Sequence, residues 1–319
     1  MRRRSWIGSV ALLAACADPS TPTAPAQTMR RSVGEGAEAS ANAKRDLREE
    51  RAALAAADRA HAAASAGGLL AGLTATFVDD VVLLYPGAPV LRGRAAATTF
   101  LTSLPGAATQ TLTWQPAFAD VSGDATRGYS YGDGTRVVGG VSSPIQYAAY
   151  WRREGGRWRT AAWLLRAGYA GTPRALPARC AAPTSRHERH FPRTVEAEQA
   201  AELLRTDATF SALSERAGGA AAFGTYVADG GVLLLGDAQG VACGPDEMRV
   251  ANDFGPGVLT WAPTLADAAP SGDLGMTVGI GAFRAGTQTF HSKYLTIWKK
   301  QRSGDWRFVL DAGNATPAP

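Results

Sequence analysis

Residues that commonly bind metals or perform catalysis are scarce in this chain of 319 residues, which has 4 histidines and 3 cysteines. It lacks a P-loop, a dinucleotide-binding glycine fingerprint, a Cys-x-x-Cys pair and a Gly-x-Ser-x-Gly motif. His187 and His190 lie close together, but they lack a third ligand and the spacing of a zinc protease helix. We therefore expect no bound metal and no cofactor.

The chain also lacks a basic surface stripe. Its formal net charge is +5, but Arg2, Arg3 and Arg4 supply three of these charges within the first few residues. Neither half of the chain shows lysine and arginine interleaved with aromatic residues, so we do not expect nucleic acid as a partner.

The first 15 residues have the pattern of a bacterial signal peptide. The three arginines precede an apolar run that is too short to span a bilayer, which needs about 20 residues. The segment ends in Leu-Ala-Ala followed by Cys16, which resembles the lipobox of bacterial lipoproteins. We expect cleavage before Cys16, lipid on that residue and a location in the cell envelope; secretion without lipid is the alternative. Residues 16–43, rich in Pro, Thr, Ala, Gly and Ser, predict a flexible tether.

The body of the chain contains one sequence pattern twice. Residues 112–120 (LTWQPAFAD) return as residues 259–267 (LTWAPTLAD). Each copy continues with Ser-Gly-Asp, then Gly-x-x-x-Gly, then Tyr-x-x-x-Trp and a further Trp-Arg. The conserved order predicts two tandem domains, residues 44–169 and 195–314, with a linker over 170–194 and a tail over 315–319.

Each copy begins with helical sequence and ends in strands. In the first copy we expect helices over 47–66, 69–77 and 94–104, and strands over 81–85, 112–118, 128–138, 145–153 and 157–165. The second copy repeats this order, starting with a helix over 196–216 and a strand over 232–235. The pattern predicts two α+β domains, each with three helices packed on a curved antiparallel sheet.

The motifs of both copies resemble the NTF2-like superfamily and, within it, the SnoaL-like/DUF4440 branch. The resemblance rests on Asp58, FVDD at 77–80, GYSYG at 128–132 and the aromatic strand pair over 147–158. It implies a cystatin-like cone with a pocket between the helices and the concave face of the sheet. It also implies pairing of the two domains through their open sheet faces, as a pseudo-dimer. It does not identify a function, because this fold hosts isomerases, hydrolases, cyclases and binding modules.

Alternation along one strand selects pocket candidates in the first copy. Tyr129, Tyr131 and Asp133 share one strand face, and we expect these larger residues to point into the pocket. The matching positions in the second copy are apolar. The comparison therefore predicts a polar pocket in the first copy and simple packing in the second.

A helix of the first copy offers a second set of candidates. Asp58 and His61 are three residues apart on one helix face and could form an acid–base pair, with Tyr85 as a further hydrogen-bond donor. The alternative is structural: Asp58 and its counterpart Asp207 occur in both copies and would then hold the fold, and His61 would have no catalytic role.

Two further features are left open or assigned to structure. Asp311 interrupts an apolar final strand at the position of Trp163 in the first copy, and we expect it to be satisfied by structural hydrogen bonds. Cys180 and Cys243 can pair in an oxidising envelope or remain free thiols.

Three functions fit these patterns. The leading prediction is an envelope lipoprotein whose first domain binds a small, largely apolar molecule, while its second domain is mainly structural. The second is an acid–base enzyme of the isomerase, hydrolase or cyclase type. The third is a non-catalytic pseudo-dimeric scaffold.

Overall fold

The computed structural model describes residues 27–167, 180, 196–236 and 240–318, with side chains from residue 47 onward. The predicted signal peptide, Cys16 and, apart from Cys180, the predicted linker lie outside these residues. We call residues 44–169 repeat one and residues 195–314 repeat two. Residues 44–319 form one compact unit that contains both repeats.

Repeat one alternates helices and strands before a long strand meander. Its elements are α1 (Gln27–Ala66), α2 (Leu69–Thr74), β1 (Phe77–Leu84), β2 (Leu91–Arg92), α3 (Arg94–Ser103), β3 (Thr111–Val121), β4 (Arg127–Val138), β5 (Val141–Glu154) and β6 (Arg157–Ala167).

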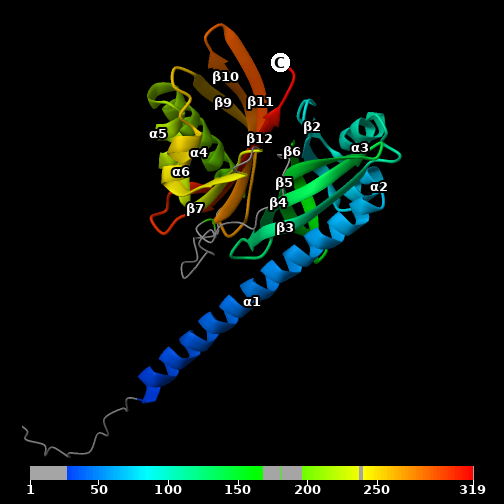
Figure 1. The fold of residues 1–319 in the computed structure, drawn as a ribbon. Coiled ribbons are helices and arrows are strands. Elements are labelled where there is room, and N and C mark those ends of the chain that lie inside the picture. Colours follow the sequence, from blue (N-terminus) through cyan, green and yellow to red (C-terminus); the bar gives the residue numbers. More distant parts are fainter. Residues whose placement is uncertain (1–26, 168–179, 181–195, 237–239, 319) are drawn as a thin grey trace, which may run out of the picture. The chain divides into compact units, whose positions relative to one another are not determined.

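Repeat two has the same order of elements (Figure 1). They are α4 (Glu196–Ala217), α5 (Gly219–Tyr226), β7 (Val227–Leu234), β8 (Val241–Cys243), α6 (Gly244–Ala251), β9 (Val258–Ala268), β10 (Leu274–Ala285), β11 (Gln288–Lys300) and β12 (Trp306–Ala315). The expected tandem arrangement is therefore present in the secondary structure.

Each repeat contains one six-stranded sheet, in the orders β2-β1-β6-β5-β4-β3 and β8-β7-β12-β11-β10-β9. The expectation of purely antiparallel sheets is wrong, because β1 pairs with β6 in parallel and β7 pairs with β12 in parallel. The four long strands of each repeat follow one another by hairpins and are antiparallel. The last strand then returns beside the first, and this long connection permits a parallel pair.

The first helix begins earlier than the expected residue 47. It starts at Gln27, so residues 27–43, which we expected to form a flexible tether, are helical. The prolines of the N-terminal region end at Pro25, and the next proline is Pro86. The stretch between them is rich in Ala, Glu and Arg, which favour helix, and contains no proline to interrupt it.

The first glycine of each Gly-x-x-x-Gly motif lets a helix pack closely on the sheet. A Cβ atom added to Gly128 would lie 2.6 Å from the side chain of Leu54 on α1. In repeat two, a Cβ atom at Gly275 would collide in the same way with Leu203 on α4. The motif therefore marks the strand face that the helices cover.

The two repeats contact each other through matching turns and charged side chains. The backbone N–H of Gly123 donates to Asp273, and that of Ser271 donates to Asp124, each over 2.9 Å. Asp120 of repeat one also forms a buried ion pair with Lys299 of repeat two. The two Ser-Gly-Asp turns thus exchange equivalent hydrogen bonds.

A disulfide joins Cys180 to Cys243 at the end of β8, with a Cα–Cα distance of 5.3 Å. The open question about these two cysteines is thereby answered in favour of pairing, and the bond ties the segment between the repeats to repeat two. In the described part of the chain, no helix has both the length and the apolar character needed to cross a membrane.

Candidate functional site

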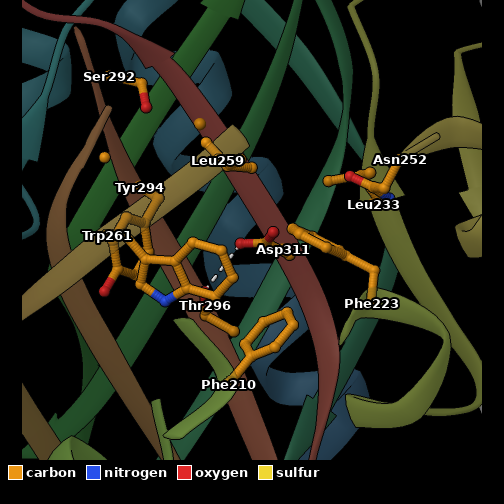
Figure 2. A pocket seen from close by; sticks show the side chains of 12 residues that line it. Phe210, Phe223, Leu233, Asn252, Leu259, Trp261, Ser292, Tyr294, Thr296 and Asp311 are labelled. Carbon is orange, nitrogen blue, oxygen red and sulfur yellow. Dashed lines mark hydrogen bonds between the residues drawn. The ribbon is translucent and has the colours of Figure 1, made fainter. Parts of the chain in front are cut away.

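Repeat two contains a cavity of about 140 Å³ between its sheet and its helices (Figure 2). Its apolar wall consists of Phe210, Phe223, Leu233, Leu259 and Trp261. Its polar side chains are Asn252, Ser292, Tyr294, Thr296 and Asp311. The cavity is thus mostly aromatic and aliphatic, with a small number of hydrogen-bonding groups on the strands.

The aromatic wall is held by ring contacts among residues from different elements. The ring centroids of Phe210 on α4 and Trp261 on β9 are 4.5 Å apart and meet edge to face. Phe210 also meets Phe223 of α5, at 4.9 Å. Because rings from two helices and a strand lock one another, this wall is a rigid apolar surface.

Asp311 is the most unusual group in the cavity. It lies on β12, is buried, and accepts a hydrogen bond from the Thr296 hydroxyl over 2.8 Å, as Figure 2 shows. Burial raises the pKa of Asp311 to about 7, and the nearby charge of Asp207 also favours the protonated form. No side chain in the described residues forms an ion pair with it. At neutral pH this carboxyl can therefore either donate or accept a proton.

Asp207 lies behind the cavity wall and has a different role. Its two carboxyl oxygens accept hydrogen bonds from the Trp261 indole N–H over 2.7 Å and from the Tyr294 hydroxyl over 2.8 Å. Burial raises the pKa of this carboxyl, although the hydrogen bonds oppose the change. Asp207 orients two residues that line the cavity, and both of its carboxyl oxygens already accept hydrogen bonds from them.

The equivalent network exists in repeat one. Asp58 accepts hydrogen bonds from the Trp114 indole over 2.7 Å and from the Tyr147 hydroxyl over 2.5 Å. This agrees with a fold-holding role for Asp58 and Asp207, whose partners are indole and phenol groups. The same three residue types at the same places in both repeats indicate a shared structural core.

The predicted Asp58–His61 pair is not formed. The Nε2–H of His61 donates to the Leu73 carbonyl over 2.9 Å, and the His61 ring packs edge-on against Trp114 at 4.9 Å. Burial lowers the pKa of His61 to about 4, so the ring is neutral at physiological pH. The pair is absent because the His61 ring donates its Nε2–H to the Leu73 carbonyl, while Asp58 accepts from Trp114 and Tyr147.

Tyr129, Tyr131 and Asp133 do not face the helices, contrary to the expectation. Ser130, between the two tyrosines, accepts a hydrogen bond from the buried Trp151 indole, and Gly128 faces Leu54 of α1. By alternation, the tyrosines lie on the opposite face of β4, where both contact Phe118 on β3.

That opposite face is buried as well. Tyr129 and Tyr131 belong to the same apolar cluster as Met276 and Val278 of repeat two. Burial raises the pKa of both tyrosines, and neither hydroxyl has a hydrogen-bond partner among the described residues. Large size alone predicted that these side chains face a pocket, but a large side chain can equally be buried between two sheets.

Tyr85 follows β1 and lies apart from the other candidates of repeat one. Its hydroxyl accepts hydrogen bonds from Gln110 over 3.2 Å and from Arg136 over 2.8 Å. The structure therefore disperses the six pocket candidates of repeat one among an inner network, an outer sheet face and the position after β1.

The expectation that structural hydrogen bonds satisfy Asp311 agrees with its bond from Thr296, but it did not include the place of Asp311 on a cavity wall. In repeat two, Asp311 lies opposite Thr296, and in repeat one Trp163 lies opposite Ala149 at the equivalent place. Trp163 packs against Trp114 at 5.8 Å and Tyr147 at 6.4 Å. The signal was present in the sequence: a carboxylate replaces the largest apolar side chain in the middle of a buried strand.

No protein-family model matches this chain, and no curated protein matches it. Solved structures do. A ketosteroid isomerase-like protein from Erwinia carotovora is 25% identical, covers 37% of this chain and 95% of its own, and has a TM-score of 0.32.

Two further solved structures give similar values. An NTF2-like protein from Pseudomonas putida is 18% identical over 40% of this chain and 92% of its own, with a TM-score of 0.33. An NTF2-like protein with a cystatin-like fold from Novosphingobium aromaticivorans is 18% identical over 40% of this chain and 86% of its own, also with a TM-score of 0.33. The structural neighbours of this chain thus include NTF2-like, ketosteroid isomerase-like and cystatin-like proteins.

Proposed function

We propose that repeat two binds a small, largely apolar molecule that carries one hydrogen-bonding group. The observation that carries this proposal is the position of Asp311, a buried carboxyl without an ion-pair partner in the described residues, on the wall of an otherwise mostly apolar cavity. An aromatic cavity with few polar groups suits a ligand that is apolar over most of its surface and polar at one point.

The volume limits the size of the bound group. Drug-sized ligands occupy pockets of about 300–1,000 Å³, whereas a cavity of about 150 Å³ accommodates a molecule of the size of benzene. The cavity of about 140 Å³ therefore fits one ring or a short branched chain. Its polar substituent, a hydroxyl or a carbonyl, would meet Asp311.

Phenol and benzene are suitable probes because they differ by one hydroxyl. Phenol is expected to raise the unfolding temperature and to give a measurable heat of binding in titration calorimetry, and benzene is expected to bind more weakly. Asp311→Leu, which removes the polar group and narrows the cavity, should abolish the preference for phenol. Asp229→Asn removes an exposed carboxylate on β7 and serves as the control.

Two results would count against the proposal. The first is that neither probe stabilises the wild-type protein at millimolar concentration. The second is that Asp311→Leu and Asp229→Asn bind phenol equally well.

An acid–base enzyme is the second candidate, and the pKa of Asp311 favours it. A carboxyl with a pKa of about 7 can take a proton from carbon next to a carbonyl group and return it to another position. A small cyclic enone in D2O tests this: wild type should accelerate exchange of deuterium into the enone, and Asp311→Asn should not. Exchange at the same rate with both proteins would leave binding as the better proposal.

We also propose that the protein is located at the cell envelope and is anchored there by lipid on Cys16. This proposal is supported by the basic, apolar and Leu-Ala-Ala-Cys pattern of the first 16 residues. Metabolic labelling with a fatty acid should mark the wild-type protein and not Cys16→Ser.

We further propose that repeat one pairs with repeat two as a pseudo-dimer and stabilises the fold of repeat two.

A further inference from the structure

A second hollow of about 430 Å³ lies in repeat two, between α4, α5 and the turn that joins β11 to β12. It shares no lining residue with the cavity at Asp311. Its lining includes Arg205, Arg307, Thr206, Tyr226 and Trp306, which all carry hydrogen-bond donors. We call this hollow the arginine groove.

The two arginines of the groove have no side-chain partner among the described residues. Neither the Arg205 nor the Arg307 side chain forms a hydrogen bond or an ion pair within the part of the chain that the structure describes. A guanidinium group presents its donors in a planar fork that matches a carboxylate or a phosphate. Two such groups on one hollow leave a pair of charged donors available to a ligand.

A buried donor lines the same groove. Trp306 is 3% exposed, and its indole N–H has no hydrogen-bond partner among the described residues. A buried N–H without a partner is costly, because it loses its bond to water and gains nothing in exchange. The matching indole of repeat one, Trp158, is also buried without a partner among the described residues. This cost therefore belongs to the shared fold, and the arginines are what distinguish repeat two.

Two carboxylates also line the groove, but both have partners. Glu202 accepts a hydrogen bond from Lys300 over 3.1 Å. Asp305 accepts one from the Ser303 hydroxyl over 3.0 Å. Lys300 offsets the charge of Glu202, and the two arginines then exceed Asp305 by one positive charge.

Repeat one lacks the polar wall of this groove. Arg205, Thr206 and Thr209 lie on one face of α4, and the positions that match them on α1 are all alanine: Ala56, Ala57 and Ala60. The arginine that matches Arg307 on the last strand is Arg159, and it donates to the Phe77 carbonyl over 3.3 Å. The polar face and the disengaged arginine are therefore specific to repeat two and are not needed by the shared fold.

We propose that the arginine groove is a binding site for a small anion, with a carboxylate or phosphate group between Arg205 and Arg307. Arginine presents paired N–H groups that match the oxygens of both anions. Trp306 lines the groove beside the two arginines. This site is independent of the cavity at Asp311 and does not rest on the function proposed for it.

Titration with sodium benzoate and with inorganic phosphate tests the proposal. At least one of them should bind the wild-type protein in the millimolar range or better, and should shift the indole N–H signal of Trp306 in NMR spectra. That signal is assigned from its loss in Trp306→Phe. Binding of benzoate alone identifies a carboxylate site, and binding of phosphate alone identifies a phosphate site.

Matched arginine variants distinguish a site from a general charge effect. Arg205→Ala and Arg307→Ala should each weaken binding about tenfold, the scale of one hydrogen bond to a charged group. Arg249→Ala removes the same charge from an exposed Arg249–Asp246 pair outside the groove and should leave binding unchanged. Equal weakening in all three variants would overturn the proposal, and so would the absence of binding by both probes.

Discussion

The two repeats share a scaffold, and the middle of their last strand shows how they differ. Trp163 of repeat one packs against the rings of Trp114 and Tyr147, whereas the equivalent Asp311 of repeat two lies on the wall of a cavity. A large apolar side chain fills the space between sheet and helices, and a short polar one leaves room for a ligand. The exchange of Trp163 for Asp311 is thus one difference that bears directly on the cavity of repeat two.

One hydrogen-bond network is common to both repeats and therefore does not explain why only one of them is proposed to bind a ligand. In both repeats an aspartate on the first long helix receives a tryptophan indole and a tyrosine hydroxyl. Because this network is the same in the packed copy and in the copy with the cavity, it supports the fold and does not by itself create a site. The residues that differ between copies are therefore the ones to test by mutation.

Truncating Trp163 should produce the largest effect. Trp163→Ala removes a fully buried indole from repeat one, and large-to-small substitutions of aromatic core residues typically cost about 3–5 kcal/mol. Urea unfolding should show this loss in the free energy of unfolding, and Trp163→Phe, which keeps a ring, should cost less. If Trp163→Ala stays within about 1 kcal/mol of wild type, the indole is not what fills repeat one.

Asp311→Asn should remove a pH dependence from repeat two. The pKa of Asp311 is raised from 3.8 to about 7 in the folded protein, so the folded state binds this proton more tightly than the unfolded state. Stability is therefore full at low pH and falls as the pH rises from about 4 to about 7, by up to about 4 kcal/mol at 1.36 kcal/mol per pKa unit. The amide side chain of the variant cannot ionise and avoids this loss.

The measurement is the free energy of unfolding of both proteins across this pH range. Asp311→Asn should gain stability relative to wild type as the pH rises, whereas Asp229→Asn, on an exposed position, should run parallel to wild type. If the curve of Asp311→Asn also runs parallel to that of wild type, ionising the carboxyl costs little free energy in the folded state. The surroundings of Asp311 would then be more polar than the cavity lining indicates.

Much of the fold follows from the sequence because the chain carries it twice. The duplicated Leu-Thr-Trp and Ser-Gly-Asp motifs predict the repeat, and glycine, proline and β-branched residues place most strands within a few residues. The parallel pairing of β1 with β6 was missed, because pairing between strands distant in the chain leaves no local pattern. The short strands β2 and β8 were missed because two or three residues are too few for a period.

The site could be predicted only in part. The alternation of Tyr129 and Tyr131 was recognised correctly, but both faces of β4 are buried, so hydrophobicity could not indicate which face meets the helices. Asp311 stands out when the copies are compared for positions where a large side chain is replaced by a smaller one. A comparison for added hydroxyl groups does not reveal it. Whether a pocket exists depends on how much of the space between sheet and helices the side chains fill. A residue type at one position indicates this only when the same position in a second, more tightly filled copy can be compared with it.

Exchanging His61 for the residue of repeat two should give the smallest and most revealing effect. The pKa of His61 is lowered to about 4 by burial, so the neutral ring stabilises the fold above pH 6.5, and this contribution is lost as the pH falls towards 4. His61→Phe introduces the residue type that repeat two carries at the matching position, Phe210. The phenyl ring cannot take up a proton and should avoid a loss of up to about 3 kcal/mol near pH 4.

At pH 7 the same variant should instead be about 1 kcal/mol less stable than wild type, because the Leu73 carbonyl loses its donor. The unfolding curves of the two proteins should therefore cross between pH 7 and pH 4. Curves that never cross would show that His61 gains protons without cost, as a solvated or catalytic histidine would, and repeat one would again be a candidate for chemistry.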